Sequence, residues 1–395
     1  MDRLAMIVLL SSAAMAATSL CLQAGEPAGA GKGDAPGSTL PRPVRGFHTQ
    51  IPGFWGADGR PHLAECEKFI REVLGPRGVN VLVLEVGYNF QYKSWPKLGY
   101  AKAIGAAEIK SLLKVCGEAK IKLIPQFNCL GHQMTSPGSL LGEYPEFQEK
   151  PGSYPKSLKD PMPEQKNGAS YCPLHPEIHK IVFGLLDELA EAFETDTVHV
   201  GLDEVFAIAS SNCPRCAEKA PDVLFAGEVA AIHDHLASRK RAMMMWGDRF
   251  LLATDFGIVD WGWATSRNYT HPAVDKVPKD ILICDWQYER APQTPQFFVR
   301  KGFSVMSCPW WVENVALTQL KMMRDLAADK DAVVAARSLG VMQTTWVEMQ
   351  DFITAWYDRI PPVEKQPAWQ RKGDFPWKAA ARSSAVFRKL SSEWK

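Results

Sequence analysis

The chain has 395 residues, 46% of them hydrophobic and 23% charged, which is the composition of a globular protein with a sizeable core. Its 45 Lys and Arg residues nearly balance 44 Asp and Glu residues, giving a formal net charge of +1 without a long run of either sign. The charges therefore give no reason to expect nucleic acid or an anionic membrane as a partner. The oligomeric state does not follow from the sequence.

The first 24 residues have the build of a secretory signal peptide, with a basic residue near the start, then an apolar stretch and then small residues. We therefore expect export to the periplasm or the extracellular space. Cys21 follows Leu20, which is large for a lipoprotein cleavage site, so lipid anchoring at Cys21 is not expected. Residues 25–43 are rich in Gly, Ala and Pro and predict a flexible linker. No later segment is apolar enough to span a bilayer.

Short apolar or β-branched runs alternate with amphipathic segments between residues 44 and 360. The runs that predict strands are Val44–Thr49, Asn80–Val86, Lys122–Asn128, Thr197–Glu204, Ala242–Asp248, Ile281–Trp286, Phe303–Trp310 and Val341–Glu348. The segments that predict helices are 62–74, 106–119, 178–193, 222–239 and 318–326.

Strands that alternate with helices form a parallel sheet, and eight such units predict an α/β fold of the (β/α)8 TIM-barrel type as a single domain over 44–360. A helical extension is expected over 361–395. A doubly wound open sheet is the alternative fold, but no Gly-rich dinucleotide fingerprint follows an early strand.

Polar and aromatic residues occupy the C-terminal ends of all eight predicted strands, which is where the active sites of such barrels lie. They are His48 and Gln50; Glu85 and Tyr88; Gln126, Asn128 and His132; Asp203 and Glu204; Trp246 and Asp248; Asp285 and Trp286; Trp310 and Trp311; and Trp346 and Glu348. The chain also has 13 Trp residues, whose indole faces pack well against the apolar faces of sugars. The pattern predicts a pocket with an acidic centre and aromatic walls, which suits a carbohydrate.

Asp203 and Glu204 are adjacent carboxylates at the end of the fourth predicted strand. Like charges repel, so one of the two tends to keep its proton near neutral pH, and a protonated carboxyl beside an ionised one is what glycoside cleavage requires. A solvated acidic turn is the alternative for such a pair taken alone. Adjacent residues of a regular strand point to opposite faces, so we expect the chain to leave the strand between Asp203 and Glu204.

Three motifs resemble the catalytic domain of family 20 glycoside hydrolases, the β-N-acetylhexosaminidases. The family's HxGGDEV is similar to HVGLDEV at 199–205, its IPExDxPGH to IPQFNCLGH at 124–132, and its late WSE to WVE at 346–348. The resemblance covers roughly residues 43–358. It implies retaining hydrolysis of a β-linked N-acetylhexosaminide, in which the substrate's own 2-acetamido oxygen attacks the anomeric carbon. The implied partner is a glycan or glycoconjugate, and the resemblance implies no cofactor and no metal.

By this resemblance, Glu204 is the general acid and base, Asp203 orients the acetamido nitrogen, and His132 tunes Glu204. The residues expected to bind the sugar are His48, Glu85, Gln126, Asn128, His199, Trp246, Trp286, Trp311, Trp346 and Glu348. Trp311 stands where the family has a Tyr that bonds the acetamido oxygen, and an indole N–H could donate the same bond.

Several positions depart from the family pattern. The Arg that grips sugar hydroxyls after the first strand is missing from residues 48–52, and Gln126 and Asn128 replace carboxylates. Two alternatives therefore stay open. One is a glycosidase for sugars without an acetamido group, with Glu85 or Glu348 as nucleophile, and the other is a barrel that binds carbohydrate without cleaving it. Gluco or galacto preference and exo or endo action do not follow from the sequence.

Eight cysteines follow the predicted signal peptide, and Cys213 and Cys216 are separated by only two residues. This spacing suits a local disulfide or half of a zinc site. No second pair with this spacing occurs, which favours a disulfide that clips the loop.

Overall fold

The computed structural model describes residues 40–53, 63–150, 169–258, 262–366 and 376–394. The predicted signal peptide and most of the predicted linker lie outside these residues. At the linker's described end, Leu40 is buried and the side chain of Arg42 donates to the carbonyl of Ala336, so packing against the domain begins before the first strand. Within the described part of the chain, no helix has both the length and the apolar character needed to cross a membrane.

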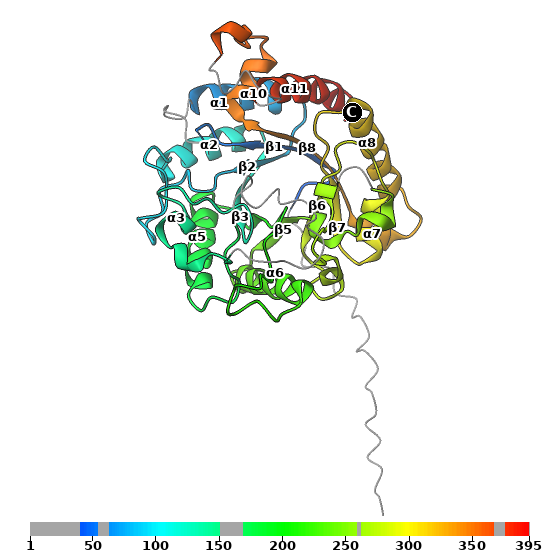
Figure 1. Ribbon diagram of the computed structural model, residues 1–395. Coiled ribbons are helices and arrows are strands. Elements are labelled where there is room, and N and C mark those ends of the chain that lie inside the picture. Colours follow the sequence, from blue (N-terminus) through cyan, green and yellow to red (C-terminus); the bar gives the residue numbers. More distant parts are fainter. Residues whose placement is uncertain (1–39, 54–62, 151–168, 259–261, 367–375, 395) are drawn as a thin grey trace, which may run out of the picture. The chain divides into compact units, whose positions relative to one another are not determined.

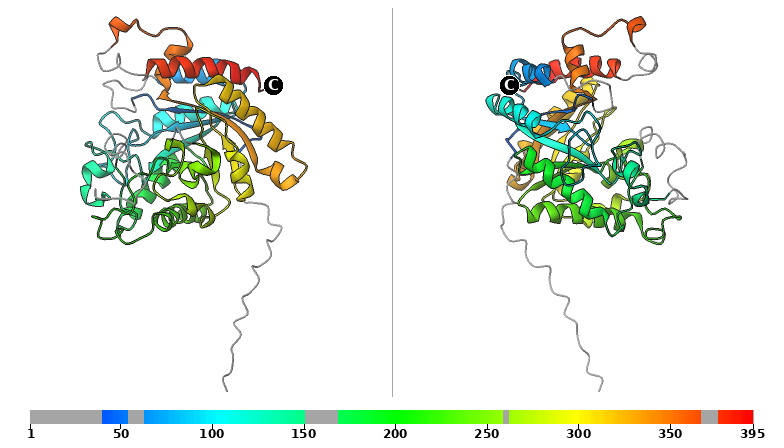
Figure 2. Two further views of the ribbon diagram at one scale, coloured as in Figure 1. Left: turned by 45° about the vertical axis from the view of Figure 1, so that its right-hand side comes forward. Right: turned by 90° about the vertical axis from the view of Figure 1, so that its left-hand side faces the viewer.

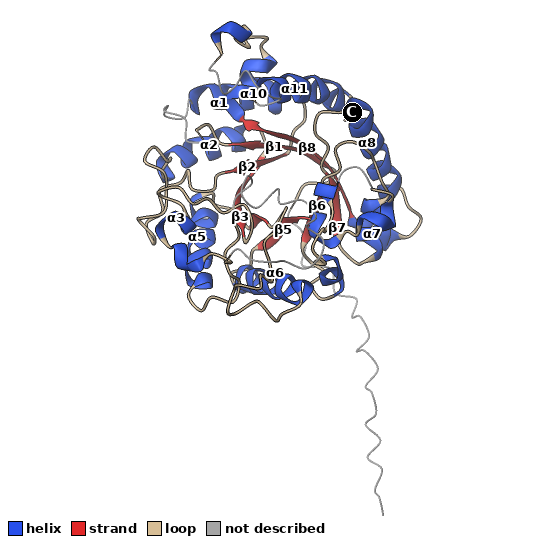
Figure 3. Cartoon of the chain, in the orientation of Figure 1, coloured by secondary structure: helices blue, strands red, loops and turns tan. Residues whose placement is uncertain are grey.

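Eight parallel strands form a closed barrel in which neighbours in space are also neighbours in sequence (Figure 3). They are β1 Val44–Gln50, β2 Val81–Glu85, β3 Lys122–Cys129, β4 Thr197–Gly201, β5 Ala242–Trp246, β6 Leu282–Asp285, β7 Ser304–Ser307 and β8 Ser338–Glu348. Strand β1 pairs with both β2 and β8, which closes the barrel and excludes the open sheet. Every residue of β2, β4 and β6 is buried, because helices cover the outer face and side chains fill the interior. The predicted TIM barrel is confirmed.

Helices surround the strands on the outside of the barrel (Figure 1). Those expected from the sequence are α1 Leu63–Phe69 with its π-helical continuation η1 Ile70–Leu74, α2 Ala106–Glu118, α5 Ile178–Ala192, α6 Pro221–Ser238 and α8 Glu313–Ala327. Helix α5 shows how these helices pack, because Ile181, Leu185 and Leu189 recur at steps of four on one face and are buried.

Further helices complete the outer layer and the loops. They are α3 Leu140–Glu143, α7 Thr294–Arg300, α9 Ala332–Arg337, α10 Met349–Trp356 and α11 Trp377–Ser392, with short turns η2 Pro145–Phe147, η3 Asp248–Phe250, η4 Ala253–Phe256, η5 Gly262–Ala264, η6 His271–Asp275 and η7 Val363–Lys365. The C-terminal helix α11 packs against α8, α10 and β8 (Figure 2). Its Phe387 is completely buried, with its ring centroid 5.0 Å from that of Phe47 in β1.

Strand β4 ends at Gly201, two residues before Asp203, so the chain leaves the strand earlier than expected. Gly201, Leu202 and Glu204 adopt left-handed φ values of +68°, +67° and +46°. A Cβ on Gly201 would lie 2.2 Å from Oδ1 of Asn128 in β3, so only glycine fits there. The turn frees both carboxyl side chains from the alternation of the strand.

Strand β8 carries an irregularity beside the same end of the barrel. Its register against β1 shifts between His48, which pairs with Thr344, and Gln50, which pairs with Glu348. Trp346 lies within this bulge at φ +52°. Bulges re-aim side chains next to active sites, and this one sets the direction of Trp346.

Candidate active site

Asp203 and Glu204 follow β4, and both side chains converge on one histidine. Nε2 of His132 lies 3.3 Å from Oδ2 of Asp203 and 3.4 Å from Oε2 of Glu204. His132 belongs to the loop after β3, so the contact joins two neighbouring loops at the C-terminal end of the barrel. The side chain of Asp203 is 6% exposed and that of Glu204 15% exposed. The structure brings the three residues together and leaves Glu204 the more accessible carboxyl.

A buried ion pair holds the backbone of Glu204. Oδ2 of Asp248, which follows β5, accepts a hydrogen bond from the backbone N–H of Glu204 at 3.0 Å and from Nε of Arg249 at 2.6 Å. Trp286 donates its indole N–H to the other oxygen of Asp248 at 3.3 Å. Arg249 is completely buried and also donates to the carbonyl of Trp263 at 2.7 Å. Because a left-handed φ is unfavourable for a residue other than glycine, these contacts help to hold Glu204 in place.

Amide side chains fix the loops that carry the pair and the histidine. Nδ2 of Asn268 donates to the two carbonyls that follow Glu204 in the chain, at 2.8 and 2.9 Å. Nε2 of Gln133 donates to the carbonyl of Gly131 at 3.0 Å, on the other side of His132. Both loops are therefore held by buried hydrogen bonds as well as by their strands.

Burial and neighbouring charges set the protonation of this site. Burial raises the pKa of Glu204 to about 7, with the His132 cation opposing the shift and the Asp203 carboxylate adding to it. Burial disfavours the charge on His132, but Asp203, Glu204 and Glu85 outweigh it and raise the pKa of His132 to about 10. Near neutral pH, His132 is therefore a cation and Glu204 can both donate and accept a proton, as a general acid and base must.

Amide groups hold Glu85 at the end of β2. Its two carboxyl oxygens accept hydrogen bonds from Nε2 of Gln50 at 3.0 Å and from Nδ2 of Asn128 at 2.8 Å. Oδ1 of Asn128 accepts from Gln126 at 2.9 Å, and Oε1 of Gln126 lies 3.0 Å from Nε2 of His48. Burial raises the pKa of Glu85 to about 7, against the pull of its amide donors. A carboxyl engaged on both oxygens and partly protonated is poorly suited to act as a nucleophile.

Four of the expected sugar-binding residues form an aromatic cluster inside the barrel. The ring centroid of Trp246 lies 5.3 Å from that of His48, 4.5 Å from that of His199 and 5.4 Å from that of Trp346. Trp246, His48 and His199 are completely buried, and burial lowers the pKa of His48 to about 4, so its ring is neutral. Trp346 is partly exposed. Of this cluster, Trp346 is the side chain that can face a bound sugar directly, and the other three support it.

Tyr288 supplies a hydroxyl at this aromatic wall. Its Oη accepts a hydrogen bond from the indole N–H of Trp346 at 2.5 Å, and its ring stacks on that of Trp286 with centroids 4.9 Å apart. Glu348, expected at the far edge of the sugar, accepts from the backbone N–H of Gly53 at 2.7 Å. This bond ties the end of β8 to the loop after β1.

The contacts of Trp311 differ from those expected. Its ring stacks on that of Trp310 with centroids 3.7 Å apart, its indole N–H lies 3.4 Å from an oxygen of Glu289, and Arg382 of α11 lies over its face. These contacts tie Trp311 to its neighbour Trp310, to Glu289 and to the C-terminal helix α11. Trp311 lies in the loop between β7, which ends at Ser307, and α8.

Three residues of this environment were not expected from the sequence, namely Arg249, Asn268 and Tyr288, and a fourth, Asp248, was expected at a strand end but without a role. An Asp and an Arg side by side after a barrel strand are a signal that could have suggested a buried ion pair. Asn268 gives no such signal, because it lies in an irregular segment between β5 and β6. Tyr288 lies three residues after the end of β6, so the strand pattern does not mark it.

One acceptor at the centre of the site has no donor among the described residues. Oδ1 of Asp203 is buried and accepts no hydrogen bond there. A buried carboxylate oxygen without a donor is unfavourable, so a ligand that brings an N–H or O–H to this point gains binding energy. The arrangement can therefore accept an N–H at Asp203 while Glu204 delivers a proton.

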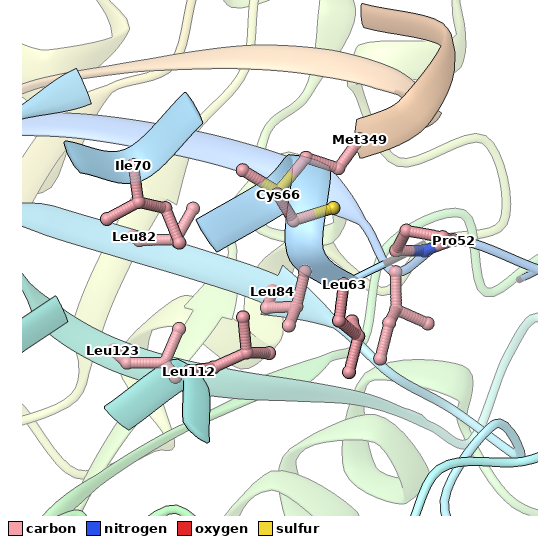
Figure 4. A pocket seen from close by; sticks show the side chains of 10 residues that line it. Pro52, Leu63, Cys66, Ile70, Leu82, Leu84, Leu112, Leu123 and Met349 are labelled. Atoms are coloured by element: carbon pink, nitrogen blue, oxygen red, sulfur yellow. The ribbon is translucent and has the colours of Figure 1, made fainter. Parts of the chain in front are cut away.

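An apolar cavity lies elsewhere, between the barrel wall and the first helices (Figure 4). Leu82 and Leu84 of β2 face Cys66 and Ile70 across it. Its lining is aliphatic apart from sulfur, so it offers nothing that could bind sugar hydroxyls. The polar groups gather at the carboxyl pair instead.

Cys213 and Cys216 are free thiols in the structure, so the disulfide favoured from their spacing is not formed. Sγ of a third thiol, that of Cys172, lies 3.5 Å from Sγ of each of the two. The three sulfurs therefore form one buried cluster.

Two relatives with sequence similarity to this chain are β-hexosaminidases. A β-hexosaminidase of Akkermansia muciniphila is 30% identical over 112 residues, which are 28% of this chain and 21% of that protein. A β-hexosaminidase of Vibrio furnissii is 25% identical over 228 residues, which are 57% of this chain and 32% of that protein. The chain thus spans about a third or less of the length of these relatives.

Solved structures share the barrel. The chitobiase of Flavobacterium johnsoniae superposes with a TM-score of 0.56 at 17% identity, covering 88% of this chain and 50% of that one. An exo-β-N-acetylglucosaminidase of Vibrio harveyi, solved with N-acetylglucosamine, gives 0.56 at 15% identity over 89% of this chain and 60% of that one. The family model for the catalytic domain of glycosyl hydrolase family 20 matches residues 94–355, more than half of the chain. The chain therefore belongs to glycosyl hydrolase family 20.

Proposed function

We propose that the protein is a β-N-acetylhexosaminidase that releases β-linked N-acetylhexosamine from glycans by substrate-assisted, retaining hydrolysis. The observation that carries this proposal is the buried, unpartnered Oδ1 of Asp203 beside Glu204, whose pKa is raised to about 7 by burial. Membership in family 20 and the similarity to β-hexosaminidases support it.

In the first step, protonated Glu204 donates its proton to the glycosidic oxygen while the bond from that oxygen to the anomeric carbon breaks. The acetamido carbonyl oxygen of the same sugar forms the new bond to the anomeric carbon, giving an oxazolinium ion. Oδ1 of Asp203 accepts the acetamido N–H, and the charge of Asp203 stabilises the positive ring. His132 lies against both carboxyl groups, and its positive charge balances theirs while Glu204 changes its protonation state.

In the second step, Glu204 acts as a carboxylate and takes a proton from the water that attacks the anomeric carbon. The bond to the acetamido oxygen breaks, and the acetamido group is restored. Two inversions at one carbon give net retention. Trp346 and Tyr288 wall the sugar, with the hydroxyl of Tyr288 fixed by the indole of Trp346.

An acyl series tests the proposed nucleophile. Aryl β-glycosides with increasingly fluorinated 2-acetamido groups carry progressively weaker carbonyl nucleophiles. We expect kcat to fall steeply along the series, because the carbonyl oxygen attacks in the rate-determining bond change. A kcat that is indifferent to fluorination would point to an enzyme carboxylate as nucleophile, as in the alternative with Glu85 or Glu348.

We also propose that residues 1–24 direct export and are removed. The basic, apolar and small-residue pattern supports this. Mass spectrometry of the mature N-terminus tests it: a chain that retains Met1 in the purified exported fraction would contradict it.

A further inference from the structure

A cluster of three thiols and one carboxylate lies outside the active site. One ligand atom from each of Glu149, Cys172, Cys213 and Cys216 falls within 4.8 Å of every other, and all four residues are buried. Sγ of Cys172 lies 3.5 Å from Sγ of Cys213 and from Sγ of Cys216. The sequence shows only the Cys-x-x-Cys half of this cluster, because the other two residues come from a separate loop.

The spacing fits one tetrahedral cation. A zinc–sulfur bond of about 2.3 Å places neighbouring sulfurs of a tetrahedron about 3.8 Å apart, close to the separations seen here.

The carboxylate gives an independent indication. Glu149 is 1% exposed, and its Oε1 accepts a hydrogen bond from the backbone N–H of Ser210 at 2.8 Å. Its Oε2 is buried without a partner among the described residues. A buried carboxylate oxygen without a hydrogen-bond donor is unfavourable, and a cation bound between it and the three thiols would stabilise it.

We propose that Glu149, Cys172, Cys213 and Cys216 bind one Zn²⁺ ion that has a structural role. Soft thiolates select zinc over magnesium or calcium, and four protein ligands leave no open position for water or substrate. The ion therefore takes no part in glycoside cleavage. The inference is independent of the proposed activity, because it rests on residues outside the carboxyl pair.

The ion would link the two loops that carry the active-site residues. Cys172 follows Tyr171, whose backbone N–H donates to the carbonyl of Leu130 at 3.1 Å, close to His132. Cys213 belongs to the loop after β4 that carries Glu204. Zinc would thus hold the histidine loop and the carboxyl-pair loop together.

Metal content tests the proposal directly. The full chain, purified without chelator or added metal, is expected to carry about one zinc per chain by elemental mass spectrometry. Cys216→Ser should lower zinc to background. Cys116→Ser removes an equally buried thiol of α2 and should leave zinc at one per chain. Glu149→Gln keeps an acceptor for Ser210 but removes the charge, so it should lose zinc to a chelator faster than the unchanged protein.

A second measurement uses the unchanged protein, so its result does not depend on whether a variant folds. The unchanged full chain, produced with cobalt in place of zinc, should show the thiolate-to-metal charge-transfer band and the visible bands of a tetrahedral site. Metal-free protein in which Cys172, Cys213 and Cys216 are all free thiols, iron in place of zinc, or a disulfide among the three cysteines in peptide mapping would each overturn the proposal. None of these readouts depends on turnover, so a failure here is distinct from a failure of the proposed function.

Discussion

Glu204 and His132 are a pair whose charges depend on each other. Glu204 must hold a proton to act as an acid, and the His132 cation is the main influence that lowers its pKa against burial. The contact at 3.4 Å between these two side chains therefore sets the pH range over which Glu204 can act as an acid. The wild-type kcat/KM should fall as pH rises above about 7, when Glu204 loses its proton.

Replacing the cation tests this dependence. In His132→Gln, the pKa of Glu204 is no longer held down, so the alkaline limb of kcat/KM should move to higher pH while the maximal rate falls. A pH profile with an aryl glycoside measures both. His233→Gln, on the outer helix α6, should leave the limb near 7. An unchanged limb in His132→Gln would mean that another group controls the acid.

For single residues, the sequence predicts the members of the site that belong to a short motif. Asp203, Glu204 and His132 stand in two motifs, and the structure places them in contact. The sequence places Trp311 after the seventh strand but does not predict its contacts with Glu289 and Arg382, because these depend on how the loop and α11 pack. The adjacent Asp248 and Arg249 suggest an ion pair, but the sequence does not predict that Asp248 also accepts from the backbone N–H of Glu204.

The end of β4 is the element on which the site depends. Gly201 occupies a left-handed conformation where a Cβ would lie 2.2 Å from Oδ1 and 2.8 Å from Cα of Asn128. The turn that frees both carboxyls begins at this residue. Sequence periodicity predicts the strand but not its last residue, because the apolar pattern continues to Leu202.

Gly201→Ala should therefore be costly. We expect unfolding free energy to drop by about 2 kcal/mol or more, from the left-handed φ and the contact with Asn128, with a parallel loss of activity. Gly117→Ala in α2 meets nothing within 4 Å and should stabilise by about 0.5–1 kcal/mol. Urea unfolding measures the unfolding free energy of both variants. A Gly201→Ala protein as stable as the unchanged protein would contradict the described turn.

Asp248→Asn tests the link between β5 and the loop after β4. The amide leaves Arg249 buried without its counter-ion, which should cost about 3–5 kcal/mol of stability and weaken the hold on the Glu204 backbone. Asp255→Asn, an exposed residue of η4, should change neither stability nor kcat. Thermal unfolding and initial rates measure the pair of variants. Equal stability of Asp248→Asn and Asp255→Asn would indicate that another group serves as the counter-ion of Arg249.

For the whole molecule, the alternation of eight strands with amphipathic segments predicts the barrel, and the closed strand order confirms it. The helices α7, α9 and α10 were not predicted individually, since runs of 7, 6 and 8 residues are too short to show a helical period and are ordered by packing on the barrel. Barrel closure by β8 on β1 pairs Glu348 of the WVE motif with Gln50, almost 300 residues earlier in the sequence.

The buried acids also shape stability as a function of pH. Burial raises the pKa of Glu85, Glu204 and Asp285 to about 7, and their unfolded forms ionise near 4 to 4.5. Folded protein thus binds more protons, so this stability is full at low pH and is lost as pH rises through about 7. We expect unfolding free energy to fall by about 1 kcal/mol per carboxyl between pH 6.5 and 8. Urea unfolding at both pH values should show a smaller fall in Glu204→Gln, and a stability that rises over this range would contradict the shifts.

The central claim is that Glu204 cleaves a glycoside whose 2-acetamido group lies against Asp203. The most direct measurement compares hydrolysis of an aryl N-acetyl-β-hexosaminide with that of the matching aryl β-hexoside, by the unchanged protein and by Glu204→Gln. The acetamido substrate should be hydrolysed, the hexoside should not, and Glu204→Gln should lower kcat by about 10²–10⁴-fold. Turnover of the hexoside alone, or equal turnover by Glu204→Gln, would contradict the account.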